Sequence, residues 1–192
     1  ACEAANDWNQ ALALFKDMQG EGLKPDSFTF KALLSACAEG QGFEPALQVF
    51  EGMQQPPHGV EADVTAYTTL ISACRHSLDW KQSHALYQRM RSQAIAPDTA
   101  MYNALISACA RDGAWTQALV FFKQIREEGL TPDEWSYNAT MDACAKVHQW
   151  EEALELFEDM KRACIAPSTV TFTTLITACG RAGEWEQALG LF

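Results

Sequence analysis

Residues 99–133 read TAMYNALISACARDGAWTQALVFFKQIREEGLTPD, and this stretch contains the pattern that decides the fold. Its first half carries an apolar stripe at the i, i+3, i+4, i+7 spacing of a helix: Tyr102, Leu105, Ile106 and Cys109. Gly113 then suits the left-handed turn that ends a helix. A second stripe at the same spacing comprises Trp115, Ala118, Leu119, Phe122 and Ile125. Because Pro132 blocks continuation of the second helix, the stretch predicts a pair of helices.

The same pattern recurs along the whole chain at a spacing of 35 residues. Tryptophans stand in one register at Trp80, Trp115, Trp150 and Trp185. We therefore predict a partial repeat 1–26, full repeats 27–63, 64–98, 99–133 and 134–168, and a truncated repeat 169–192. No repeat shows the two-residue alternation of a strand. The sequence predicts an all-α solenoid of antiparallel helix pairs in one right-handed superhelix, with helices near 64–76, 80–93, 99–111, 115–128, 134–146 and 150–163.

Six of the seven cysteines follow the same repeat, one in each unit: Cys2, Cys37, Cys74, Cys109, Cys144 and Cys179. Zinc sites bring cysteines together in pairs two to four residues apart, and this spacing does not. We interpret the six as small buried packing residues, and we predict no metal site. Cys164 lies near the end of a predicted helix, where we expect a free thiol. This cysteine usage is typical of a reducing compartment.

Composition and motifs restrict the possible functions. The 192 residues include 14 basic and 25 acidic side chains, giving a formal net charge of −11. That charge argues against binding to nucleic acid or an anionic membrane through bulk positive field alone. No apolar run approaches the roughly 18–20 residues of a membrane span, so we predict no membrane insertion. No catalytic or phosphate-binding motif occurs, and we therefore expect neither enzymatic activity nor a cofactor.

The repeats resemble the plain 35-residue type of the pentatricopeptide repeat (PPR) family. The first helices carry the resemblance in 65–71 (TAYTTLI), 101–106 (MYNALI) and 171–176 (TFTTLI). The second helices carry it in 118–122 (ALVFF) and 153–157 (ALELF), and residues 129–133 (GLTPD) match the closing segment. The resemblance implies binding of single-stranded RNA, one base per repeat, in a chloroplast or mitochondrion.

By the same resemblance, the fifth residue of a repeat and its last residue read one base together. These pairs are Thr68 with Asp98, Asn103 with Asp133, and Asn138 with Ser168, and the family pairings imply the reading G-U-C. Thr173 is the fifth residue of the truncated repeat, and Lys31 with Asp63 departs from the usual pattern. The second residue of a repeat is expected to sandwich the base. Val170 fits that aliphatic role, whereas Thr65, Ala100 and Trp135 depart from it.

The surface of the first helices is predicted from the core stripe. If Tyr102 and its stripe face the core, the opposite stripe comprises Ala100, Asn103, Ser107 and Ala110. Equivalent stripes of neighbouring repeats are expected to stack into one groove. The polar residues Asn103 and Asn138 on it can also be read as solvated side chains without a role in binding.

Basic residues recur in one register beside this groove: His76, Arg111, Lys146 and Arg181. We expect Arg111, Lys146 and Arg181 to contact successive phosphates. The alternative is that these cations only complement the dipoles of the helices that they end. The net charge of −11 and the predicted exposure of Phe28 and Trp135 also leave a second function open. In it the chain is a protein-binding scaffold, or a structural subunit of a large organellar complex, that meets partners through its acidic outer helices.

Overall fold

A computed structural model of the chain describes residues 4–40, 42–74, 80–184 and 186. Within these ranges it contains ten helices and no strand, which confirms the all-α prediction. The register residues Cys2, His76 and Trp185 lie outside the described residues. No helix of the described ranges combines the length and the apolar character that crossing a membrane requires.

The helices fall into two compact units, and the chain divides between Pro97 and Asp98. The first unit holds α1 (Ala4–Gly20), α2 (Ser27–Gly40), α3 (Phe43–Gln54), α4 (Val64–Ala73) and α5 (Trp80–Ser92). The second unit holds α6 (Thr99–Asp112), α7 (Trp115–Glu127), α8 (Glu134–Lys146), α9 (Trp150–Arg162) and α10 (Thr169–Ala182). The predicted bounds of α5 to α9 are confirmed to within one residue. The handedness of the superhelix and the bounds of the repeats stay predictions.

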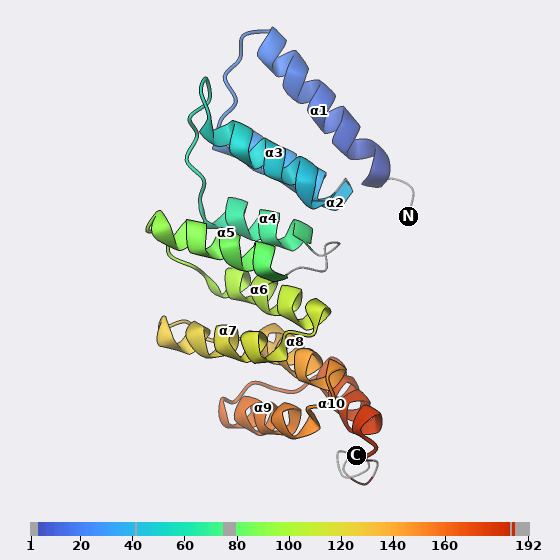
Figure 1. The fold of residues 1–192 in the computed structure, drawn as a ribbon. Coiled ribbons are helices and arrows are strands. Elements are labelled where there is room, and N and C mark those ends of the chain that lie inside the picture. Colours follow the sequence, from blue (N-terminus) through green and yellow to red (C-terminus); the bar gives the residue numbers. More distant parts are fainter. Residues whose placement is uncertain (1–3, 41, 75–79, 185, 187–192) are drawn as a thin grey trace. The chain divides into compact units, whose positions relative to one another are not determined.

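Each unit consists of two layers of helices (Figure 1). In the second unit, α8 packs between α6 and α10 in one layer, and α7 and α9 form the other layer. In the first unit, α2 packs against α4, while α1, α3 and α5 form the second layer. Only Gly113 and Ala114 separate α6 from α7, so the two helices run antiparallel. Gly113 makes this reversal with φ 71°, a left-handed conformation that glycine adopts without strain.

Within each unit, an edge-to-face aromatic pair recurs where a second helix meets the first helix that follows it. The rings of Phe122 in α7 and Tyr137 in α8 lie 4.8 Å apart at 68°. In the first unit, Phe50 in α3 and Tyr67 in α4 repeat both values. The remaining pairs have centroid distances of 5.4 and 5.6 Å and comprise Phe15 with Phe30 and Phe157 with Phe172. These pairs join successive helix pairs into a continuous core within each unit.

The repeated cysteines are packing residues, as predicted. The buried free thiols are Cys37, Cys74, Cys109, Cys144 and Cys179. Burial raises the pKa of the Cys109 and Cys144 thiols to about 12, so both are protonated near neutral pH. Cys164 is an exposed free thiol. Among the described residues, no three His, Cys, Asp or Glu side chains converge as a metal site would require.

We expect Phe122→Ala to lower the free energy of unfolding by about 3–5 kcal/mol, because it leaves a cavity beside the buried Tyr137 ring. The matched control is Val120→Ala on the same helix, whose side chain is 44% exposed. The control should change stability by less than about 0.5 kcal/mol. Urea denaturation followed by circular dichroism measures both, and equal effects of the two variants would contradict the proposed role of the aromatic pair.

Candidate functional site

The last residue of a repeat starts the first helix of the next one. Asp63, Asp98 and Asp133 occupy the N-cap positions of α4, α6 and α8 in extended backbone conformation. Each carboxylate accepts a hydrogen bond from the backbone N–H three residues on, at 3.0, 2.7 and 2.8 Å respectively. Ser168 occupies the N-cap position of α10. The aspartates at the last position of a repeat, where base reading is expected, therefore also cap a helix.

Asn103 on α6 reaches across to the start of α8. Its Nδ2 donates to both carboxylate oxygens of Asp133 at 3.2 Å. Its Oδ1 accepts from the Ser136 hydroxyl at 2.6 Å. Burial pushes the pKa of Asp133 upward, but hydrogen bonds from Ser136 and Asn103 outweigh burial and hold it below its ordinary value. The structure thus brings together one of the base-reading pairs implied by the resemblance.

Asn138 on α8 makes a related contact with the start of α10. Its Oδ1 accepts from the Thr171 hydroxyl at 2.8 Å, and its Nδ2 donates to Glu134 Oε1 at 3.3 Å. Within the described part of the chain these are the hydrogen-bond partners of its amide, and Ser168 is not among them. Thr171 Oγ1 in turn accepts from the Ser168 backbone N–H at 3.1 Å. Asn138 therefore meets Ser168 through Thr171 rather than directly.

The threonines at the fifth position use their protons within their own helices. Thr68 Oγ1 donates to the Val64 carbonyl, and Thr173 Oγ1 donates to the Thr169 carbonyl, each at 2.8 Å. Each hydroxyl therefore offers lone pairs to a partner on the helix surface. Thr68 belongs to the first unit and Asp98 to the second, and each is described within its own unit. In the first unit, the pair that departs from the family pattern is an ion pair, with Lys31 Nζ 2.5 Å from Asp63 Oδ2.

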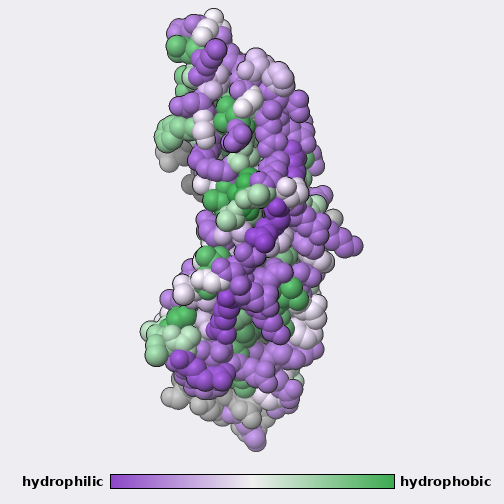
Figure 2. Space-filling view, turned by 90° about the vertical axis from the view of Figure 1, so that its left-hand side faces the viewer, coloured by the Kyte–Doolittle hydropathy of each residue, from purple (hydrophilic) through white to green (hydrophobic). Residues whose placement is uncertain are grey.

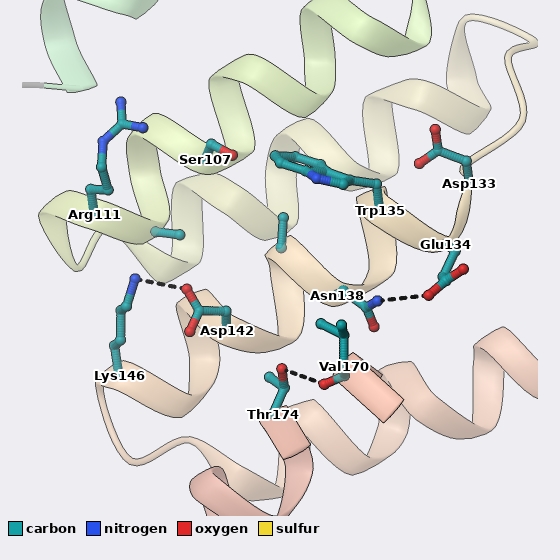
Figure 3. Close-up of a pocket in the computed structure, with 12 residues that line it drawn as sticks. Ser107, Arg111, Asp133, Glu134, Trp135, Asn138, Asp142, Lys146, Val170 and Thr174 are labelled. Carbon is teal, nitrogen blue, oxygen red and sulfur yellow. Dashed lines mark hydrogen bonds and ion pairs between the residues drawn. The ribbon is translucent and has the colours of Figure 1, made fainter. Parts of the chain in front are cut away.

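A pocket of about 730 Å³ opens over α6, α8 and α10 of the second unit. Figure 3 shows Trp135 and Val170 on either side of Asn138, with Arg111 and Lys146 together at one end. The Trp135 side chain is half exposed and Val170 is exposed. Ala100 is exposed and lies outside the lining of this pocket. Predicted site residues of three successive repeats thus line one pocket.

Charges of both signs line this pocket. Arg111 and Lys146 stand in the last turns of α6 and α8, opposite in sign to Asp133, Glu134 and Asp142. Lys146 Nζ lies 2.7 Å from Asp142 Oδ2 in a surface ion pair. Arg181 occupies the equivalent last turn of α10 and is exposed. These positions fit a phosphate contact and a complement to the helix dipole equally well.

The first unit has a smaller pocket, of about 240 Å³, over α2 and α4. Its lining includes Thr65, Thr68 and Ser72 from α4, and its one charged residue is the acidic Glu39. This pocket thus presents hydroxyl groups where the pocket of the second unit presents an amide, an indole ring and cations.

The predicted surface stripe of α6 needs a correction. Ala100 is exposed and Ser107 is half-buried, but Asn103 is only 9% exposed and Ala110 only 2%. The reason is that α8 packs beside α6 in the same layer and covers that side of the stripe. Asn103 is therefore a buried, hydrogen-bonded residue and not a solvated one. Sequence reasoning also missed Ser136 and Thr171, whose spacing from Asp133 and Ser168 is the three-residue spacing of a capping box.

Comparison with known proteins identifies similar families and folds. The model of the PPR repeat family matches residues 1–39, 97–146 and 135–181, and that of the pentatricopeptide repeat domain matches residues 56–112. A chloroplastic pentatricopeptide repeat-containing protein of Arabidopsis thaliana is 31% identical over 47% of this chain and 18% of its own length. The mitochondrial 15S rRNA processing factor CCM1 of Yarrowia lipolytica is 27% identical over 50% of this chain and 13% of its own.

Solved structures show the same architecture. The pentatricopeptide repeat protein PPR10 from maize matches with a TM-score of 0.75 and 26% identity, over 96% of this chain and 26% of its own. PPR10 in complex with an 18-nt psaJ RNA element matches with a TM-score of 0.79 and 28% identity, over 98% of this chain and 27% of its own. The chain thus spans about a quarter of PPR10 and less than a fifth of these curated relatives.

The lowered pKa of Asp133 leads to a test of stability against pH. An ionised Asp133 stabilises the fold above its ordinary pKa, and this contribution is lost as the pH falls through the lower pKa of the folded state. We expect the stability advantage of the parent over Asp133→Asn to decrease by about 0.5 kcal/mol between roughly pH 6 and pH 3, a small value because the carboxylate is exposed. Urea denaturation across this range measures it, with Glu155→Gln on α9 as the control. An advantage that stays constant with pH would contradict the assignment.

Proposed function

Because the chain belongs to the pentatricopeptide repeat family, we propose that it binds single-stranded RNA along the first helices of its repeats, one base per repeat. The observation that carries the proposal is the pocket of the second unit, where Trp135, Asn138 and Val170 meet Arg111 and Lys146. It offers a base a ring to stack on, an amide for its edge and cations for its phosphates. The complex of PPR10 with an RNA element, at 28% identity, supports the same function for this chain.

In this proposal a base lies between the second residues of two successive repeats. The indole of Trp135 supplies a flat surface, and stacking on such a ring is worth about 1–3 kcal/mol per base. The Val170 side chain covers the opposite side of the base. The Asn138 amide, which lies between them in Figure 3, offers both a donor and an acceptor to the base edge.

The three complete repeats from residue 64 to residue 168 would read G-U-C from 5′ to 3′. Thr68 with Asp98 reads guanine, Asn103 with Asp133 reads uracil, and Asn138 with Ser168 reads cytosine, following the pairings of the family. The Asn103–Asp133 hydrogen bonds support the middle assignment. The lone pairs of Thr68 support the first, because guanine offers N–H donors on its Watson–Crick edge.

We propose further that the chain acts by binding rather than by catalysis and works in a chloroplast or mitochondrion. Curated relatives carry both organelle names, and one of them is named a rRNA processing factor. The second candidate, a protein-binding scaffold, is favoured by the net charge of −11 and by Phe28, which is 80% exposed. Against it, Figure 2 shows a mostly hydrophilic face on which hydrophobic residues form small separate patches.

The proposed recognition of the middle base by Asn103 and Asp133 can be tested directly. Asn103→Thr should move the preference at that base from uracil toward guanine, changing the affinity ratio of the two RNAs by about fivefold, the value of one net hydrogen bond. Fluorescence anisotropy with labelled single strands that contain GUC or GGC measures the ratio. Ser107→Ala, a neighbouring change on the pocket side of α6, should leave it unchanged. An Asn103→Thr variant that binds with the parent's preference would refute the assignment.

Salt dependence tests the phosphate contacts. Three cations on a single strand contribute a slope of about −2 in log K against log salt, at about −0.7 each. We expect Arg111→Glu to flatten the slope by about 0.7 and to weaken all sequences alike, because phosphate contacts carry no base information. Arg162→Glu on the exposed surface of α9 changes the net charge equally and should leave the slope as it is. If both variants behave alike, or if neither the parent nor a variant binds RNA, the scaffold function is favoured.

A further inference from the structure

We propose that the third residue of each following repeat, Ser136 for Asn103 and Thr171 for Asn138, determines base specificity by fixing the orientation of the asparagine amide. This inference rests on the proposed RNA binding and adds a positioning residue to it. The amide of asparagine has a donor end and an acceptor end, so its orientation decides which of the two meets the base. A side chain that selects one orientation therefore acts on specificity without touching the RNA.

The two hydroxyls are placed to make this selection. Ser136 Oγ lies 2.6 Å from Asn103 Oδ1, and Thr171 Oγ1 lies 2.8 Å from Asn138 Oδ1. Both side chains are fully buried, with no exposed surface. Because both hydroxyls are buried, water does not compete with the asparagine oxygen for their protons. Each hydroxyl reaches back 33 residues in sequence, to the helix of the preceding repeat.

The helix start sets the direction of each hydroxyl. The N-cap backbone N–H of Asp133 donates to Ser136 Oγ at 3.2 Å, and that of Ser168 donates to Thr171 Oγ1 at 3.1 Å. An oxygen that already accepts there directs its own proton elsewhere. For Thr171 the acceptor is Asn138 Oδ1, and for Ser136 it is shared between Asn103 Oδ1 and Asp133 Oδ1, the latter at 2.8 Å.

Reversing either amide would lose these interactions. A reversed Asn103 would place Oδ1 against the Asp133 carboxylate, so that two acceptors face each other without a proton between them. A reversed Asn138 would turn Oδ1 toward Glu134 in the same way. Each amide is therefore held at both ends, by an acidic residue at Nδ2 and by a hydroxyl at Oδ1. These contacts fix the order of the remaining Nδ2 proton and Oδ1 lone pair, both on Asn138, which lines the pocket, and on Asn103, which is 9% exposed.

The hydroxyl occurs where an asparagine needs it. Two repeats have asparagine at the fifth position, and the third residue of the repeat after each is Ser136 or Thr171. After the repeat with Lys31 the third residue is Ala66, and after the repeat with Thr68 it is Met101. Neither side chain can donate a hydrogen bond to an amide. Lys31 and Thr68 have no amide to orient, since Lys31 pairs with Asp63 and Thr68 bonds its own helix. The third residue thus follows the chemistry of the preceding fifth residue along one chain.

The test compares Ser136→Ala with the conservative Ser136→Thr, using four labelled single strands in which the middle base of GUC is varied. Ser136→Ala should reduce the preference for uracil about three- to tenfold, the value of one net hydrogen bond. Ser136→Thr restores the hydroxyl and should keep the preference. The matched control is Thr29→Ala, which removes a hydroxyl at the same position of repeat 27–63, where it donates to Asp26 at 2.7 Å. This control should leave the preference for uracil at the middle base unchanged.

Two further measurements separate positioning from stability. In ¹⁵N spectra without RNA, the side-chain NH₂ signals of Asn103 should shift in Ser136→Ala and return in Ser136→Thr. If Ser136→Ala does not fold, a second experiment adds a hydroxyl in the first unit instead of removing one from the second unit. In Lys31→Asn the new amide has no hydroxyl opposite it, and Lys31→Asn/Ala66→Ser supplies one. The double variant should then discriminate the base read by that repeat about threefold or more better than the single variant.

The outcomes distinguish this inference from the function on which it rests. If the parent shows no base preference with any strand, the RNA-reading function fails. If the parent discriminates and Asn103→Thr changes the preference, but Ser136→Ala keeps both preference and NH₂ signals, the positioning role is overturned. Loss of preference in Ser136→Ala with rescue in Ser136→Thr supports it.

Discussion

The edge-to-face contact between an aromatic ring on a second helix and the ring on the next first helix is the interaction on which the rest of the structure depends. A single pair of helices buries too little surface to be stable alone, so stability arises between neighbours. Phe122 and Tyr137 make that junction in the centre of the second unit, with both rings buried. The Tyr137 hydroxyl is satisfied as well, because it donates to Asp159 at 2.9 Å and accepts from Arg126. Burial raises the pKa of Tyr137 to about 12, so the ring stays neutral.

This junction brings the helix starts within reach of the preceding helix, and the starts then serve two purposes. Asp133 caps α8 and also accepts from the Asn103 amide. A residue in this position must first be a good N-cap, which limits it mainly to Asp, Asn, Ser and Thr. The small set of side chains proposed to read bases is therefore the set that can start a helix. Substitutions that alter reading here also alter stability, and the two effects need separate measurements.

Electrostatics in the second unit favours selectivity over strong general attraction. The cations Arg111 and Lys146 share the pocket with three carboxylates, and Lys146 is already paired with Asp142. A surface pair of this kind contributes little stability and remains open to exchange with a phosphate. In a chain of net charge −11, base contacts and stacking on Trp135 must then supply a large share of any binding energy. Under the proposed RNA binding, the orientation of the asparagine amides would matter more in such a groove than in a strongly basic one.

The sequence by itself determined the helix pairs, the bounds of α5 to α9 to within a residue, the burial of the described repeat cysteines and the exposure of Trp135, because each follows from the spacing of residues along a single helix. It also placed Asn103 beside Asp133 through family resemblance. Only the tertiary structure decided that Asn103 is buried, that Asn138 bonds Thr171 rather than Ser168, and that Ser136 orients toward an amide 33 residues away. These contacts join neighbouring helices of one layer. Their partners depend on how closely the helices pack and how each is rotated, which a pattern of residues along one helix does not specify.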